Sequence, residues 1–179
     1  MLKKILLVLI ALIVGFAIYV SRQPSEFRVE RSLTIAAPAA KIFTLVNDFH
    51  QWDAWSPWAK LDPNATHAIE GTGEGVGAIM RWSGNSEVGQ GSMTITESKQ
   101  NELVQYKLEM LKPFPGNNTS EFNLKADGDK TTVTWSMYGE NDFIHKAMGV
   151  IFNCKKMVGE RFDQGLENIK TLAETGSKQ

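Results

Sequence analysis

The sequence contains a single cysteine, Cys154, so no disulfide can form within the chain. Its three histidines, His50, His67 and His145, stand far apart, and no two have the spacing of a metal-binding motif. Structural zinc sites usually combine four Cys or His ligands in two closely spaced pairs. We therefore predict no metal site.

An excess of positive charge is also missing. The chain has 19 Lys and Arg against 20 Asp and Glu, and without Lys3, Lys4 and Arg22 the count is 16 against 20, a net charge of −4. Proteins that bind nucleic acid normally carry a basic patch or stripe. The composition therefore predicts no nucleic-acid partner.

Nucleotide and nucleophile motifs are weak or missing. Gly73, Gly75 and Ala78 fit a loose G-x-G-x-x-A pattern, but a phosphate site needs a helix to begin directly after the turn. Residues 79–82 have the pattern of a strand instead, so we expect these glycines to form a hairpin or a bend. No G-x-S-x-G nucleophile elbow is present. We predict no nucleotide and no other cofactor.

One long apolar run dominates what the sequence does contain. Residues 5–20 carry no charge, and Lys3 and Lys4 precede them. The run would span about 24 Å as an α-helix at ~1.5 Å per residue, and flanking residues can extend it toward the ~30 Å of a bilayer core. We predict a single-pass membrane anchor over residues 1–22, followed by a linker at 23–26.

A cleaved signal peptide is the alternative for this segment. Residues 15–17 (Gly-Phe-Ala) form its one small-x-small triplet, but apolar residues 18–20 follow where a signal peptide turns polar. A soluble, buried helix is a poor third choice, because the run is apolar on every side. The basic residues closest to the run precede it, which favours a cytoplasmic N-terminus. The domain would then be extracytoplasmic, in the periplasm of a Gram-negative source.

The remaining chain predicts an α+β domain. Residues 27–35 alternate as a half-buried strand does, and a helix follows Pro38. A shorter strand near 66–70 and two-residue periodicity from 76 to 137 bring the strands to seven. The connections are short, and Asp127-Gly128 is a strong hairpin signal. We expect a strongly curved antiparallel sheet.

The C-terminal segment has helical spacing. Its apolar residues recur every three or four positions from Met148 to Leu172, and Asp142 is a plausible N-cap. Gly159 and Gly165 would let this helix approach the sheet closely or leave room beside it. A curved sheet that grips one long helix encloses space in which ligands often bind.

Several segments together have the pattern of a known superfamily. They are residues 31–32, 37–38, 47–58 (NDFHQWDAWSPW), 62–63, 75–78, 82–84, 113–114, 132–135 and 162–166. The chain resembles SRPBCC proteins, also called START-like or polyketide cyclase/dehydrase and lipid-transport proteins. The resemblance covers about residues 27–174, which leaves 175–179 as a tail. It implies a helix-grip fold with an apolar cavity between the sheet and the C-terminal helix. Members bind lipids, sterols or polyketides, and a minority catalyse cyclisation or dehydration; no catalytic motif carries over.

Ten residues are candidates for lining such a cavity. They are Arg31, Trp52, Trp55, Trp58, Met80, Trp82, Tyr106, Trp135, Met137 and Phe162. The three tryptophans in 52–58 are either core residues or the wall of a pocket, because aromatic side chains supply large apolar contact areas. Contact with the membrane surface is a third, weaker possibility.

Four polar residues need separate interpretation. Arg31 shares strand parity with inward-facing residues, so we expect it to pair with an acid such as Glu70 or Glu87 or to anchor a ligand headgroup or carboxylate. Asp48, Asp53 and His50 cluster locally and could supply a general acid/base pair, although capping and turn formation around a short helix are the simpler role.

The sequence supports three functional hypotheses. The first is a membrane-tethered, non-enzymatic domain that binds a hydrophobic or amphipathic, lipid-like small molecule. The second is an enzyme of the cyclase or dehydratase type that acts on an apolar carbonyl compound. The third is a membrane-associated protein-interaction module, which would show an exposed apolar patch outside the grip.

Overall fold

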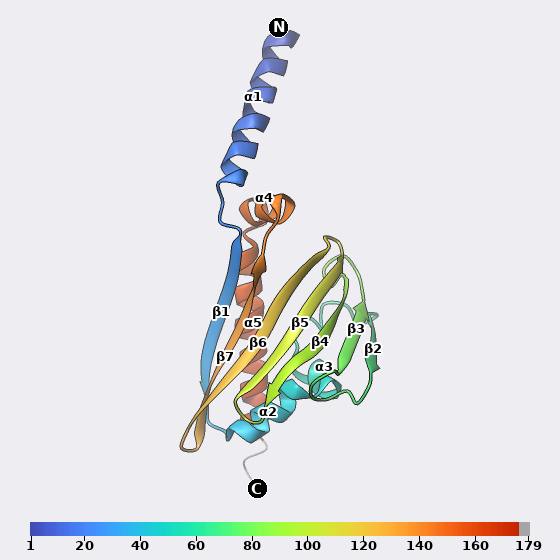
Figure 1. The fold of residues 1–179 in the computed structure, drawn as a ribbon, viewed down its shortest axis with the longest axis vertical. Coiled ribbons are helices and arrows are strands. Elements are labelled where there is room, and N and C mark those ends of the chain that lie inside the picture. Colours follow the sequence, from blue (N-terminus) through green and yellow to red (C-terminus); the bar gives the residue numbers. More distant parts are fainter. Residues whose placement is uncertain (176–179) are drawn as a thin grey trace.

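A computed structural model describes residues 1–175 of the chain (Figure 1). The elements in chain order are α1 (Leu2–Ser21), β1 (Glu26–Ile35), α2 (Ala39–Asn47), the 3-10 helix η1 (Phe49–Gln51), α3 (Trp52–Trp55), β2 (Thr66–Glu70), β3 (Ile79–Ser83), β4 (Gln90–Lys99), β5 (Leu103–Lys112), β6 (Gly116–Asp127), β7 (Lys130–Glu140), α4 (Phe143–Phe152) and α5 (Cys154–Thr175). Of the predicted tail, 176–179 lie outside the described residues.

The seven strands form one antiparallel sheet in the order β1-β7-β6-β5-β4-β3-β2. The sheet curves, and α5 lies along its concave face with α2 and α3 beside it (Figure 1). The predicted α+β architecture is confirmed, including β2 at the expected residues. The connection between β5 and β6 is short, as expected, because β5 ends at Lys112 and β6 begins at Gly116.

Tight turns and glycines explain how the sheet and helix fit together. The predicted β6–β7 hairpin is present, and Gly128 adopts φ +61°, a backbone conformation that glycine adopts without steric cost. On α5, a Cβ at Gly165 would lie 2.6 Å from the indole of Trp135, and one at Gly159 would overlap the guanidinium of Arg31. These two glycines therefore allow the close approach of helix and sheet.

The prediction of one continuous helix from about residue 142 to 172 is wrong. Asn153 adopts a left-handed conformation (φ 48°, ψ 51°) and separates α4 from α5. Asn tolerates this region better than other non-glycine residues. Asp142 does cap a helix, because its carboxylate accepts a hydrogen bond from the backbone N–H of His145, but the helix it caps is α4.

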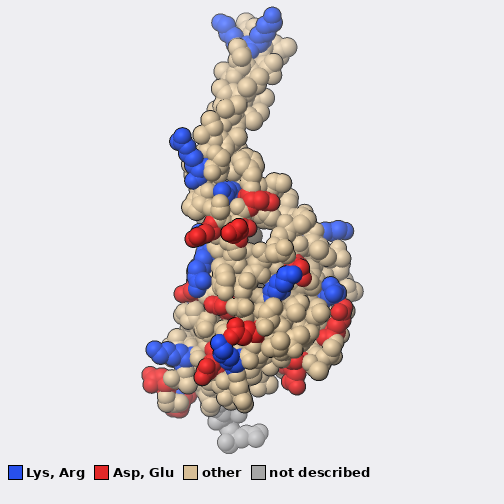
Figure 2. Space-filling view, viewed as in Figure 1, with Lys and Arg blue, Asp and Glu red and all other residues tan. Residues whose placement is uncertain are grey.

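The N-terminal helix α1 projects away from the domain (Figure 1). It is long and apolar enough to cross a membrane, a test that a signal sequence near an N-terminus also passes. Its side chains are exposed except for Ala17, which is half-buried, and Val20, which is buried at the end that meets the domain. Figure 2 shows an uncharged shaft with basic groups at both ends.

Candidate functional site

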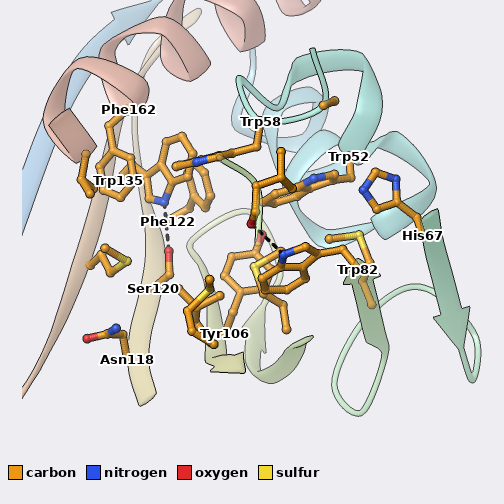
Figure 3. Close-up of a pocket in the computed structure, with 18 of the residues that line it drawn as sticks. Trp52, Trp58, His67, Trp82, Tyr106, Asn118, Ser120, Phe122, Trp135 and Phe162 are labelled. Atoms are coloured by element: carbon orange, nitrogen blue, oxygen red, sulfur yellow. Dashed lines mark hydrogen bonds between the residues drawn. The ribbon is translucent and has the colours of Figure 1, made fainter. Parts of the chain in front are cut away.

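A pocket of about 240 Å³ lies between the concave face of the sheet, α5 and the segment around α3 (Figure 3). Its lining comprises Trp52, Trp58, Ala59, His67, Met80, Trp82, Glu87, Val88, Met93, Tyr106, Leu108, Met110, Asn118, Ser120, Phe122, Trp135, Met137, Val158 and Phe162. Ligand sites in proteins usually measure about 300–1,000 Å³. The pocket is therefore suited to a small molecule rather than to a lipid with two long chains.

An aromatic row across β5, β6 and β7 forms one wall of the pocket. Tyr106 meets Phe122 edge-on with ring centroids 6.1 Å apart, and Phe122 stacks on Trp135 at 4.6 Å. Phe162 of α5 stacks on the other face of this system, 4.0 Å from Trp135. The stack joins helix to sheet, so it supports the fold and shapes the pocket at once.

The three predicted tryptophans divide between the core and the pocket wall. Trp55 is 1 % exposed, and its indole N–H donates to the carbonyl of Leu45 at 2.8 Å. Trp52 packs edge-on against Trp55 at 4.7 Å and faces the pocket, as Trp58 does from the loop after α3. Trp55 is thus a core residue that packs behind the part of the pocket wall formed by Trp52 and Trp58.

The polar groups of the aromatic wall are satisfied within the protein. The indole N–H of Trp135 donates to Ser120 Oγ at 3.0 Å, and that of Trp82 donates to the carbonyl of Val88 at 3.2 Å. The hydroxyl of Tyr106 donates to the carbonyl of Val46, and burial raises the pKa of this phenol far above its ordinary value. The wall therefore offers rings and thioethers to a ligand and few hydrogen bonds.

Three polar side chains add chemistry to this apolar lining. His67 Nδ1 lies 3.3 Å from Asp53 Oδ1, so a carboxylate orients the imidazole at the pocket. Glu87 and the amide of Asn118 lie elsewhere on the lining. This arrangement can hold an apolar body and meet one or two polar groups on it.

Eight of the ten predicted residues line the pocket, and Trp55 and Arg31 do not. Arg31 faces α5, and its Nε lies 3.1 Å from Asp163 Oδ2, with the two side chains 38 % and 58 % exposed. The expectation of Glu70 or Glu87 as its partner was wrong. Glu70 pairs with Arg81 instead, and the helix supplies the acid for Arg31.

The predicted acid/base candidates lie outside the pocket lining. Asp48 caps η1 by accepting a hydrogen bond from the backbone N–H of His50, and it also lies 2.7 Å from His50 Nδ1. The imidazole of His50 is 59 % exposed. Capping is thus confirmed as a role of Asp48.

Sequence reasoning missed several lining residues. Leu108 and Met110 share the parity of Tyr106 on β5, so the strand pattern could have added them. Val158 lies on α5 one turn before Phe162 and could have been found the same way. His67 comes from the edge strand β2, and no local pattern indicates that it reaches the pocket. Among residues 1–175, no group of three or more potential ligands could hold a metal ion.

Comparisons with known proteins identify the family. The model of the polyketide cyclase/dehydrase and lipid transport family matches residues 26–174. The chain therefore belongs to this family, and the START-like resemblance is confirmed. A search of curated proteins found no match.

Solved structures share the fold at low sequence identity. A START superfamily protein from Mycobacterium smegmatis is 17 % identical, with a TM-score of 0.60 over 84 % of this chain and 99 % of that one. The Aha1 dimer from Colwellia psychrerythraea is 16 % identical, with a TM-score of 0.61 over 84 % and 98 %. DynU16, a putative protein in the dynemicin biosynthetic locus, is 13 % identical, with a TM-score of 0.58 over 83 % and 48 %.

Proposed function

We propose that this chain is a membrane-anchored binding protein for one small, largely apolar molecule held in the pocket between sheet and helix. The observation that carries the proposal is the lining itself: aromatic rings and thioethers surround a space that the protein's own side chains leave open. Methionine is flexible and polarisable, which suits a wall that must adapt to its ligand. Membership of a family described by lipid transport supports the same interpretation.

The size and polarity of the pocket narrow the class of ligand. A volume of about 240 Å³ favours a molecule with one small ring system or one short chain. Because the indole donors of Trp82 and Trp135 are already used, affinity would come from apolar contact. A single polar group on the ligand could reach the amide of Asn118. We therefore propose an amphipathic ligand with a dominant apolar part.

The proposal assigns α1 the role of an uncleaved, single-pass anchor. The basic residues Lys3 and Lys4 favour a cytoplasmic N-terminus. The binding domain would then lie outside the cytoplasm, in the periplasm of a Gram-negative source. A membrane-impermeant thiol reagent would test this orientation in intact cells of the Cys154→Ser, Asp129→Cys variant. Labelling of the thiol introduced at position 129 only after the cells are broken would contradict it.

Intrinsic fluorescence provides the test of binding. All five tryptophans lie in the domain, and four of them line the pocket. The full chain in vesicles should show a saturable change in tryptophan emission with naphthol or with a short-chain fatty acid such as octanoate. The Val158→Phe variant should lose this response because the added ring occupies the pocket. The control Val76→Phe changes an exposed residue outside the lining and should bind normally. Equal binding by both variants, or no response in the unmodified chain, would contradict the proposal.

A second candidate function, catalysis on an apolar carbonyl compound, is favoured by the His67–Asp53 pair at the pocket. A general base must reach the proton that it removes, and His67 is the imidazole on the lining. Mass spectrometry of the ligand recovered after incubation separates the two functions. Binding predicts an unchanged ligand. Catalysis predicts a ligand that has cyclised or lost water, and His67→Gln should prevent that change.

A further inference from the structure

Helix α4 has an apolar surface that the domain does not cover. Phe143, Ile144, Ile151 and Phe152 are each at least half exposed, as is Met157 in the first turn of α5. Not one of the ten residues of α4 is buried. Large contiguous apolar patches on a soluble surface usually mark an interaction site. These five residues are called the α4 surface below.

The α4 surface lies at the end of the domain from which α1 departs (Figure 1). Helices α1 and α4 are in contact. The backbone N–H of Asn141, just before α4, donates to the carbonyl of Ser25, just after α1, at 2.7 Å. A bilayer crossed by α1 would therefore begin next to α4. The turn between β5 and β6 reaches the same end with Leu111 and Phe114 exposed.

Charge beside the α4 surface suits a membrane interface as well. Lys146 lies on α4, and Lys155 and Lys156 lie exposed in the first turn of α5. Lysine side chains can extend their charge to the headgroup layer while their stems cover apolar surface. Basic residues near an anionic membrane surface each contribute about 1 kcal/mol of attraction. Apolar side chains with lysines beside them, here from α4 and the start of α5, are a combination that interfacial segments use.

We propose that the α4 surface is immersed in the interfacial layer of the membrane that α1 crosses, so that the domain rests on the bilayer. This inference depends on the proposed anchoring by α1. A bilayer fits better than a second copy of the chain, because α1 holds the membrane beside α4 in every molecule, whatever the protein concentration. The apolar patch outside the grip is thus assigned to lipid contact rather than to a protein partner.

The docking has a consequence for the pocket. Val158, which lines the pocket, follows Met157 of the α4 surface directly. A Cβ at Gly116 would lie 3.1 Å from His145 Nε2, so α4 packs over the start of β6, where Asn118 lines the pocket. The end of the pocket near Asn118 and Val158 therefore adjoins the docked surface. A ligand leaving the bilayer would have only a short path to this end.

Spin labels on the full chain test the proposal in vesicles of phosphatidylcholine and phosphatidylglycerol. In a Cys154→Ser background, single nitroxides are attached to Ile151→Cys on α4, to Leu9→Cys in α1 and to Asp129→Cys in the β6–β7 turn at the far end. Power saturation with oxygen and with a water-soluble nickel chelate then measures depth. We expect the label at 151 to be accessible to oxygen, protected from nickel, and immersed by about 5–10 Å. The label at 129 should be fully accessible to nickel.

The three labels distinguish the possible outcomes. Nickel access at 151 equal to that at 129, with residue 9 protected, would overturn the docking and leave the anchor standing. Nickel access at residue 9 would show that α1 does not span, and both proposals would fail. Shielding of residue 151 from both reagents, with spin–spin broadening that grows with the protein-to-lipid ratio, would assign the α4 surface to a second copy and overturn the proposal. Circular dichroism confirms that each labelled variant is folded.

Discussion

The two ends of the sheet's concave face are built from the same strands but packed differently. At the end near α2, the inward residues Val104, Leu124 and Val133 are buried against the helices, where Leu166 and Ile169 of α5 are also buried. Toward α4, the same strands present the pocket residues Leu108, Met110, Asn118, Ser120 and Met137. The aromatic row of Tyr106, Phe122 and Trp135 lies at the boundary between the packed end and the pocket. One end therefore stabilises the fold, and the other keeps a space open.

The difference lies in the side chains rather than in the backbone. The pairing of β5, β6 and β7 continues without a shift from one end to the other. Branched aliphatic residues at the closed end are almost completely buried, as in the close-packed core of a protein. Methionine, serine and asparagine at the open end leave a gap that α5 borders through Val158 and Phe162 but does not fill. A binding site can thus be made by changing a few inward positions on an unchanged sheet.

Truncating one side chain at each end of the concave face tests whether the two ends differ in packing. Ile169 is fully buried, so Ile169→Ala should lower the free energy of unfolding by about 2–5 kcal/mol. Met137→Ala at the pocket should cost less than about 2 kcal/mol, since this side chain already borders a cavity. Urea unfolding followed by tryptophan fluorescence measures both. Equal losses would mean that the open end is packed as tightly as the closed one.

Substitution of Gly165 tests how closely α5 packs against the sheet, and substitution of Gly149 on α4 provides a control. Gly165→Ala places a methyl group 2.6 Å from the Trp135 ring, so we expect a loss of about 1–3 kcal/mol in unfolding free energy. Gly149→Ala is the matched control on α4, where no atom lies within 4 Å of the new Cβ. There the change should stabilise the helix by up to about 1 kcal/mol. Tolerance of Gly165→Ala without loss would show that helix and sheet are not in close contact.

The ion pair between Arg31 and Asp163 should matter less than either packing contact. Both side chains are more than one-third exposed, and exposed pairs contribute about 0–1 kcal/mol. Asp163→Asn should therefore lower the unfolding free energy by less than about 1 kcal/mol, and tryptophan-detected ligand binding should be unchanged. A large loss of binding would instead indicate that Arg31 acts on the ligand after all.

The smallest effect is expected on the outer face, at Glu30. A hydrogen bond from Arg28 at 2.6 Å, with a second from Ser136, holds the pKa of the Glu30 carboxyl below its ordinary value. A carboxyl whose pKa is lower in the folded state than in the unfolded state raises the free energy of unfolding at pH values above its ordinary pKa. This contribution is lost as the pH falls through the pKa of the folded state. Glu30→Gln should therefore flatten the acid side of the stability profile slightly. An unchanged profile in urea titrations at several pH values would contradict this.

Much of the fold could be predicted because the alternation of apolar and polar residues along each strand is visible in the sequence itself. The alternation on β5 and the Asp127-Gly128 turn fix register and direction, and the five short connections from β2 to β7 favour an antiparallel sheet. The break at Asn153 could not be predicted, since one left-handed residue leaves the apolar spacing on both sides intact. For the same reason, Ile151 and Phe152 on α4 had the pattern of core residues although they are exposed.

The site was predictable where large aromatic residues form it. Trp52, Trp58 and Phe162 stand out by type, and strand parity points Trp82 and Trp135 to one face. Partners that come from another element leave no local signal. Neither the pairing of Arg31 with Asp163 on α5 nor the arrival of His67 from the edge strand has a counterpart in sequence spacing. Whether the lining residues bind a ligand stays a prediction.

A crystal of the full chain under xenon pressure would test the central claim most directly. Apolar cavities that stay open bind xenon, whereas a packed core excludes it. The account predicts xenon density between Met80, Met137 and Trp135, and none among Val104, Val133 and Ile169. A structure in which the methionine side chains fill the space, with no xenon in the pocket, would contradict the account.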